Sequence, residues 1–171
     1  MKFSSPSILG AFSPASPDLD AIIDVLRQVQ QQVDKLDAVL TENGPVAAPM
    51  VEAFRIVIST MTSGIDTVSR LDRLKFASSL MLAGPVSELK QHTQMLSDRL
   101  LGAKPQIDAQ GDAGVVYQQT VHTKEAAQSL VSIVIDKVPS TAKGIARHQA
   151  QGIVDILAHL QESFSLDQEV L

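Results

Sequence analysis

Apolar side chains recur at spacings of three and four residues along most of this chain. The longest such stretch runs from Asp112 to Pro139, and one stripe of it is formed by Val116, Thr120, Thr123, Ala127, Leu130 and Val134. Polar residues such as Gln118 and Glu125 lie away from that stripe, so the stretch is predicted to be one amphipathic helix. The stripe is thin because half of its members are Thr or Ala. Such a helix faces either a close neighbour or a narrow space that something else fills.

Other segments carry the same helical period. We expect further helices to begin near Asp18, Val46, Asp72, Pro85 and Ser140. The helix from Val46 has the widest apolar arc, so it is predicted to be the most buried. The helix from Ser140 to Phe164 is predicted to bury one face, made of Ala142, Ile145, Gln149, Gly152, Ile156 and Leu160.

Glycine and proline predict where these helices end. Asn43-Gly44-Pro45 ends the first helix, and Gly84-Pro85 stops the short piece from Asp72 to Ala83. That piece is either a separate helix or a kinked extension of the second one. Pro105 is expected to kink its helix without ending it, because the apolar period continues to Ile107.

No segment alternates with a period of two, so the sequence predicts an all-α fold. We expect a single-domain bundle of about five mostly antiparallel helices around an elongated apolar cavity, spanning residues 18–165. Residues 1–17 are expected to be a flexible leader or an expression remnant, and residues 166–171 a frayed tail. A bundle core is consistent with 44% hydrophobic but only 4% aromatic residues.

Charge and motifs exclude several classes of function. A net charge of −5 without a run of basic residues argues against nucleic acid or an anionic membrane as the main partner. No apolar run approaches the ~20 residues that span a bilayer. The chain has no Cys, no Glu-x-x-His pair, no G-x-S-x-G turn and no phosphate-binding glycine loop. We therefore expect no catalysis, no metal and no cofactor.

Polar residues on inner faces are the remaining signal. They are Thr93, Gln119, Thr120, Thr123, Ser129, Ser132 and Gln149. A helical Ser or Thr can bond the carbonyl one turn back and need no other partner, but Gln119 and Gln149 cannot do so as easily. Gly152 indicates either a close helix contact or a cavity wall. Together these features favour an apolar tunnel with a few hydrogen-bonding positions.

Several short sequences resemble one known family. They are Leu36-Asp37, Pro85-Val86 with Leu89, Ile107-Asp108-Ala109 before Gly111, and Lys124, Ala127, Leu130, Ile133 and Lys137-Val138-Pro139. They look like the fungal hydrophobic surface-binding protein A family, which includes cell-wall galactomannoproteins, and the similarity covers about residues 18–164. The chain departs from the family in its higher charge, in Gln110 between Ala109 and Gly111, and in lacking an evident signal peptide, Ser/Thr-rich stalk or anchor signal.

The resemblance implies a secreted or wall-associated helical domain that encloses a long-chain fatty acid, palmitate-like or arachidonate-like. We expect the tunnel to be lined by Phe54, Ile58, Met61, Leu89, Thr93, Leu96, Leu100, Thr123, Ala127, Leu130, Val134, Ile145, Gly152 and Ile156. Ser129, Ser132 and Gln149 are the candidates for contact with the carboxylate. The expected state is a monomer or weak homodimer.

Two other hypotheses remain open at this point. The protein could be an amphipathic coat whose bundle opens on a hydrophobic surface. It could also be a structural or protein-interaction bundle without a defined pocket.

Overall fold

The computed structural model describes residues 16–170, with side chains for residues 16–165. Its long helices are α2 (Pro17–Asn43), α3 (Ala47–Ser69), α5 (Ala83–Gly102), α7 (Ala113–Asp136) and α8 (Lys143–Val170). Two short helices, α4 (Phe76–Leu80) and α6 (Lys104–Gln110), and a 3₁₀ turn, η1 (Ser140–Ala142), lie in the connections. The all-α bundle is confirmed, whereas most of the expected leader lies outside the described residues.

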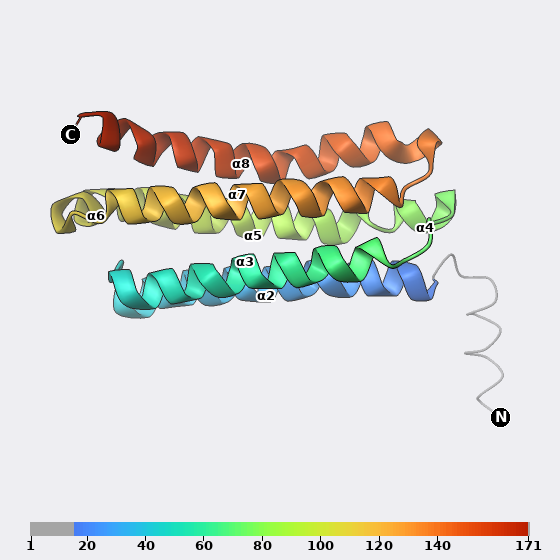
Figure 1. Cartoon of the computed structure of the whole chain (residues 1–171), viewed down its shortest axis with the longest axis horizontal. Coiled ribbons are helices and arrows are strands. Elements are labelled where there is room, and N and C mark those ends of the chain that lie inside the picture. Colours follow the sequence, from blue (N-terminus) through green and yellow to red (C-terminus); the bar gives the residue numbers. More distant parts are fainter. Residues whose placement is uncertain (1–15, 171) are drawn as a thin grey trace, which may run out of the picture.

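The five long helices form a closed ring. Around the ring, α2 packs on α3, α3 on α7, α7 on α8, α8 on α5, and α5 again on α2. Successive long helices run in opposite directions, so α2, α5 and α8 start at the end that carries α4 (Figure 1). As a result, three of the five neighbouring pairs are parallel: α3 with α7, α5 with α8, and α2 with α5. Only α2–α3 and α7–α8 are antiparallel, fewer than the sequence led us to expect, because the ring order differs from the chain order.

Ring closure by five helices leaves room at the centre. Neighbouring helix axes are about 8–10 Å apart, which puts the centre of a five-membered ring about 7–8.5 Å from each axis. The same spacing in a four-membered ring gives about 6–7 Å. Large side chains are therefore needed to fill the middle, and thin stripes leave part of it empty.

Local sequence determines where the helices begin and end. The Ser16 hydroxyl caps α2 by accepting a hydrogen bond from the Leu19 amide at 3.0 Å. Gly44 and Gly111 end α2 and α6 with φ of 70° and 77°, values that a side chain disfavours. The expected end of the first helix at Asn43 is thus confirmed.

The connection between α3 and α5 differs from the prediction. The expected helix from Asp72 to Ala83 is reduced to α4, and Gly84-Pro85 does not stop a helix but lies in the first turn of α5. Proline is tolerated there because first-turn amides have no intrahelical acceptor. In α4, Ser78 and Ser79 are buried while the larger apolar side chains of Leu80 and Met81 are exposed.

The prediction for Pro105 was wrong. The helix ends at Gly102, and Pro105 lies in the first turn of the separate helix α6. Ile107 is nonetheless fully buried. The spacing of apolar residues therefore predicted the burial of Ile107 correctly, but it did not predict the break in the helix.

Burial along the helices confirms one predicted face and corrects another. All six residues of the stripe on α7 are buried. The expected face of α8 is displaced, because Ile145 and Gln149 are exposed while Ala146, Ala150, Ile153 and Leu157 pack inward. α8 also continues past the expected end at Phe164 to Val170.

The prediction that the helix from Val46 is the most buried was wrong. Six of the 23 residues of α3 are buried, against eight of the 24 residues of α7. Each helix of the ring turns a single face inward.

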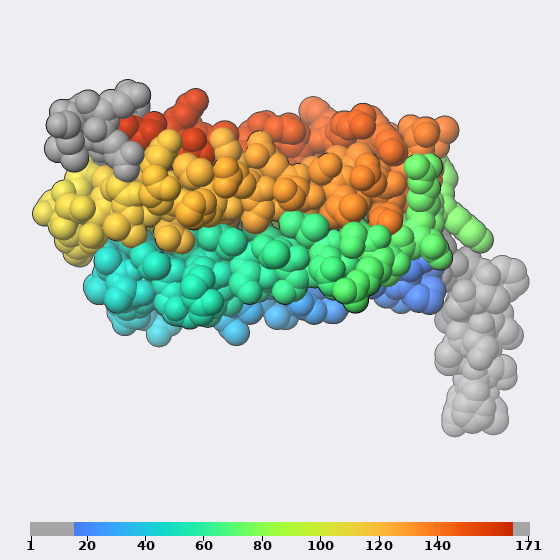
Figure 2. Space-filling model, in the orientation of Figure 1, coloured from blue at the N-terminus to red at the C-terminus, as the bar shows by residue number. Residues whose placement is uncertain are grey.

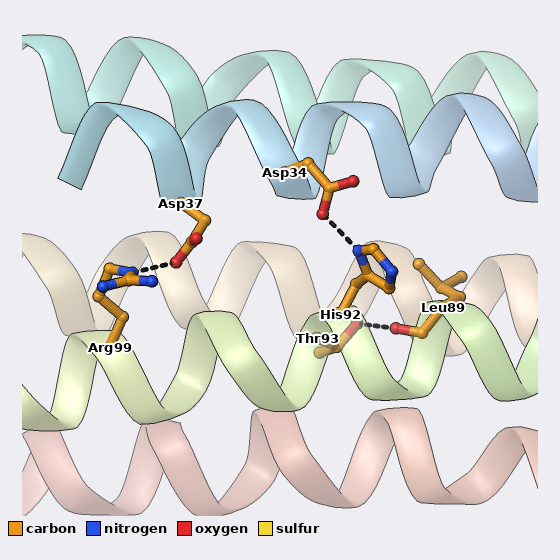
Figure 3. A network of polar contacts seen from close by, with 6 residues as sticks. All are labelled: Asp34, Asp37, Leu89, His92, Thr93 and Arg99. Carbon is orange, nitrogen blue, oxygen red and sulfur yellow. Dashed lines mark hydrogen bonds and ion pairs between the residues drawn. The ribbon is translucent and has the colours of Figure 1, made fainter. Parts of the chain in front are cut away.

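Polar side-chain contacts between α2 and α5 lie on the outside of the ring. His92 of α5 is 2.6 Å from the Asp34 carboxylate of α2, and Arg99 of α5 bonds Asp37 (Figure 3). The bond to Asp37 raises the pKa of the Arg99 guanidinium. These pairs are partly exposed, so they set the alignment of α2 and α5 more than they add stability.

Candidate functional site

An apolar cavity of about 120 Å³ lies inside the ring at the α4 end. We call it the mouth cavity, because three residues of its wall, Leu80, Ile145 and Gln149, are exposed to solvent. Its deeper wall comes from α2, α3, α5, α7 and α8, with Leu26, Met61, Leu89, Leu130 and Ile153 among the contributors.

A second, smaller space of about 20 Å³ continues toward the middle of the bundle. This inner cavity is lined by Val33, Leu36, Phe54, Val57, Met61, Leu89, Thr93, Leu96, Thr123, Ile153, Leu157 and Leu160. Met61, Leu89 and Ile153 line both cavities. These three side chains therefore lie between the two cavities.

The hydroxyl groups of the inner cavity are already engaged. Thr93 donates to the Leu89 carbonyl at 2.7 Å, as Figure 3 shows, and Thr123 donates to the Gln119 carbonyl at 2.7 Å. Both are bonds to the same helix one turn back. The inner cavity thus offers no spare donor from these two residues.

Polar groups of the mouth cavity come from Gln149 and Ser79. The Ser79 hydroxyl donates to the Phe76 carbonyl at 2.7 Å, whereas Gln149 is exposed at the rim. The exposed polar side chain of the two cavities, Gln149, therefore lies at the open end, while the hydroxyl groups deeper inside bond their own helices. Such an arrangement suits a molecule with one polar end and a long hydrocarbon chain.

The structure brings most of the predicted lining residues to these cavities. Ala127, Leu130, Val134 and Ile145 line the mouth cavity; Phe54, Thr93, Leu96 and Thr123 line the inner cavity; Met61 and Leu89 line both. Four predicted residues line neither space: Ile58, Leu100, Gly152 and Ile156.

Gly152 does not form a cavity wall. A Cβ atom at this position would lie 2.8 Å from Cε of Lys90, so the glycine makes room for the lysine chain of α5. Of the two interpretations of this glycine, the structure supports the close helix contact. The aliphatic part of Lys90 covers the seam between α5 and α8.

The expectation that Ser129 and Ser132 face the cavity was wrong. Both are exposed and line only open grooves on the outer surface of α7, with Gln128 and Asp136. They lie one and two residues from the buried Leu130, which is enough on a helix to point elsewhere. Of the three carboxylate candidates, Gln149 alone adjoins the cavity.

Sequence reasoning missed several lining residues. They are Leu26, Leu82, Val86, Val131, Ile135, Val138, Ala142, Ala146, Ala150 and Ile153. The alanines of η1 and α8 carried a usable signal, since Ala142, Ala146 and Ala150 repeat every four residues before Ile153. Small alanine side chains leave the space that a larger residue would fill.

Other kinds of site were sought in the part of the chain that the structure describes. Within residues 16–165, where side chains are described, no three His, Asp or Glu side chains gather closely enough to hold a metal ion. Within residues 16–170, every helix is too short or too polar to span a bilayer. The two cavities are the best-defined candidate site.

Comparison with known families gives one match over most of the chain. The sequence model of the family described as "Hydrophobic surface binding protein A" matches residues 19–136. The matched part runs from the start of α2 to the end of α7, so it includes four of the five helices of the ring.

Curated relatives are cell wall proteins of fungi. Cell wall mannoprotein 1 of Aspergillus fumigatus is 28% identical over 151 residues, which cover 88% of this chain and 51% of that protein. The Aspergillus flavus protein of the same name is 29% identical, over 76% of this chain and 48% of that protein. The chain spans about half the length of these relatives.

Solved structures with the same fold contain bound lipid. Ligand binding domain 1 of Penicillium marneffei MP1 protein, complexed with arachidonic acids, aligns with a TM-score of 0.81 and 22% identity, over 86% of this chain and 98% of that one. AFMP4P in complex with palmitic acid aligns with a TM-score of 0.79 and 17% identity, over 85% and 99%. At such identities the likeness establishes the shared fold.

Proposed function

The chain belongs to the hydrophobic surface binding protein A family, and from that premise we propose that it binds a long-chain fatty acid without catalysis, in the mouth and inner cavities. The observation that carries this proposal is the pair of adjoining apolar cavities inside the ring, with the exposed polar side chain of Gln149 at the open end. The lipids in the solved relatives, arachidonic and palmitic acid, have the matching shape.

Burial of the hydrocarbon chain supplies the favourable free energy of binding. Burying ~14 methylenes at ~0.8 kcal/mol each gives ~11 kcal/mol gross, before the costs of ordering and association. Micromolar or tighter binding is consistent with that figure. An ionised carboxylate buried without partners would cancel much of it, so the carboxylate belongs at the rim near Gln149 and solvent.

A bound fatty acid needs more volume than the mouth cavity provides, so the cavity must widen on binding. Pockets that enclose drug-sized ligands are usually ~300–1,000 Å³, and the mouth cavity measures about 120 Å³. Movement of the side chains that separate it from the inner cavity supplies the missing length. Met61 is suited to such movement, because an unbranched thioether changes rotamer more easily than a branched side chain.

The biological use of such binding is sequestration or transport of the fatty acid. The curated relatives are cell wall mannoproteins, which supports a secreted or wall-associated location for this protein as well. The domain would act as a monomer or weak homodimer.

A second candidate function is adsorption to hydrophobic surfaces, which the family's description favours. Titration of lipid-free protein with palmitate separates the two. Saturable binding, with a rise in Tm of about 5–11 °C at a hundredfold excess over Kd, supports the fatty-acid site. Adsorption that scales with the area of polystyrene beads, with loss of near-UV circular dichroism and no saturable uptake, supports the coat function.

A further inference from the structure

Exposed apolar side chains concentrate around the mouth cavity. Among the described residues, seven large hydrophobic side chains are exposed, and four of them lie at the α4 end: Phe76, Leu80, Met81 and Ile145, each about half exposed at 48–56%. Leu80 and Ile145 also line the cavity, so the four form an apolar rim. Figure 2 shows α4 at this end of the molecule, close to the start of α8.

Basic residues are frequent in the segments that carry this rim, although Arg147 lies in an outer groove beside Asp136. Two segments meet at the rim, residues 70–82 before α5 and residues 137–147 at the start of α8, and we call them the portal segments. They contain six basic residues, Arg70, Arg73, Lys75, Lys137, Lys143 and Arg147, and one acidic residue, Asp72. Asp136 directly precedes the second segment. The chain as a whole has a net charge of −5, whereas the portal segments carry an excess of basic residues. Asp18 and Asp20, in the first turn of α2, lie at the same end of the bundle.

The fold, and not the sequence order, brings these charges together. The Leu74 amide donates to the Lys137 carbonyl at 2.7 Å, and α4 packs against η1. This contact joins segments more than 60 residues apart, which is why no basic run is visible along the chain.

Four of the six basic side chains are available to a partner. Lys137 donates to the Leu71 carbonyl at 2.6 Å, and Arg70 pairs with Asp66 at 2.9 Å. The other four, Arg73, Lys75, Lys143 and Arg147, form no ion pair with any described residue. All but the half-buried Lys143 are exposed.

We propose that the portal segments dock on an anionic lipid surface, with the apolar rim inserted among the lipids and the four basic side chains on their head groups. Exposed apolar side chains flanked by Lys and Arg are the features that bind proteins to such surfaces. Docking in this orientation places the mouth cavity against the lipid. The surface is a separate site; only its use for loading a fatty acid rests on the function proposed above.

The test is co-sedimentation of the protein with vesicles of phosphatidylcholine, with and without phosphatidylglycerol. One variant, Phe76→Ser with Met81→Ser, removes apolar rim residues that do not line the cavity. A second variant, Arg73→Gln with Lys75→Gln, removes charge. Matched controls are Met95→Ser and Lys35→Gln, because Met95 is 55% exposed on α5 and Lys35 is exposed on α2.

We expect binding to the anionic vesicles only. Raising the salt from about 0.1 M to about 1 M should release the protein, because the Debye length falls from about 10 Å to about 3 Å. Each removed basic charge should weaken binding about fivefold, and the rim variant should also bind more weakly, while both controls bind as the unaltered chain does.

Three results would overturn the proposal. They are equal binding to neutral vesicles, equal loss in the portal variants and their controls, and self-association through the rim without vesicle binding. The last result would identify a second copy of the chain as the partner of this surface. Equilibrium uptake of palmitate in vesicle-free solution is measured separately, so failure of docking and failure of the fatty-acid site are distinguishable.

Discussion

Met61 of α3 and Leu89 of α5 lie between two apolar cavities and contribute to the wall of both. Both side chains are almost fully buried, at 4% exposure each. They come from helices that do not pack on each other in the ring, so they meet across its centre. Their positions determine whether the apolar space is one long tunnel or two short cavities.

Replacing Met61 with Ala should lengthen the tunnel. We expect the preference among saturated fatty acids to move toward longer chains by two or more carbons, at about 0.8 kcal/mol for each methylene that the new space buries. Displacement titrations with acids of increasing length measure this shift. Met50→Ala is the control, because Met50 is fully buried but lines neither cavity.

Both methionine variants should lose about 2–5 kcal/mol of stability, as large-to-small core substitutions do. The control separates that loss from the change in chain-length preference. An identical preference in Met61→Ala, Met50→Ala and the unaltered protein would show that the two cavities do not join.

Replacing Gln149 with Ala should weaken fatty-acid binding by about 1.5–3 kcal/mol, the usual value of a hydrogen bond to a charged group. Gln149 is the polar side chain at the exposed rim. Calorimetric titration with palmitate gives the affinity. Ser129→Ala and Ser132→Ala should bind as the unaltered chain does, because both serines lie on the outer surface. A loss in the serine variants equal to that in Gln149→Ala would contradict the position given to the carboxylate.

Replacing Thr93 and Thr123 with Val should leave the affinity within about twofold, because each hydroxyl already bonds its own helix. Val has nearly the same shape, and the methyl group keeps the cavity wall apolar. The same palmitate titration measures the effect. A loss of tenfold or more, about 1.4 kcal/mol, would mean that the carboxylate lies deep in the bundle among these hydroxyls.

Gly64→Ala should destabilise the protein by about 1–3 kcal/mol, a typical cost of overpacking. A Cβ atom at this position in α3 would lie 2.5 Å from Cγ1 of Val25 in α2, and a buried β-branched side chain has few rotamers with which to move away. Urea unfolding measures the difference. Gly102→Ala is the control, since its added Cβ would meet no side chain or neighbouring helix within 4 Å. The Gly102→Ala variant should be neutral or slightly stabilised. Equal destabilisation of both variants would show that loss of glycine in a helix, and not the contact with Val25, causes the effect.

Periodicity predicted α7 well and α8 poorly, for a physical reason. On α7 the stripe repeats at helical spacing without interruption, and the residues between its members are mostly polar, so the pattern marks the buried face. On α8 the buried face begins with Ala146 and Ala150, while the larger Ile145 is exposed at the rim. An exposed isoleucine beside buried alanines reverses the usual pattern, and such reversals are common at functional sites.

Three-dimensional features could not be predicted from the order of residues. The sequence indicates helices but not that α5 closes the ring by packing on both α2 and α8. The contact of Leu74 with Lys137, which assembles the portal segments, is likewise invisible in the sequence. The net charge of −5 argues against an anionic membrane as the main partner only if charge is spread evenly over the surface.

Native mass spectrometry of the purified protein, followed by delipidation and reloading with palmitate, tests the central claim most directly. The account predicts a discrete added mass equal to a long-chain fatty acid, its loss on delipidation and its saturable return with palmitate. A protein that is isolated without ligand and takes up neither palmitate nor arachidonate would contradict the account, and surface adsorption would then be the better explanation of the fold.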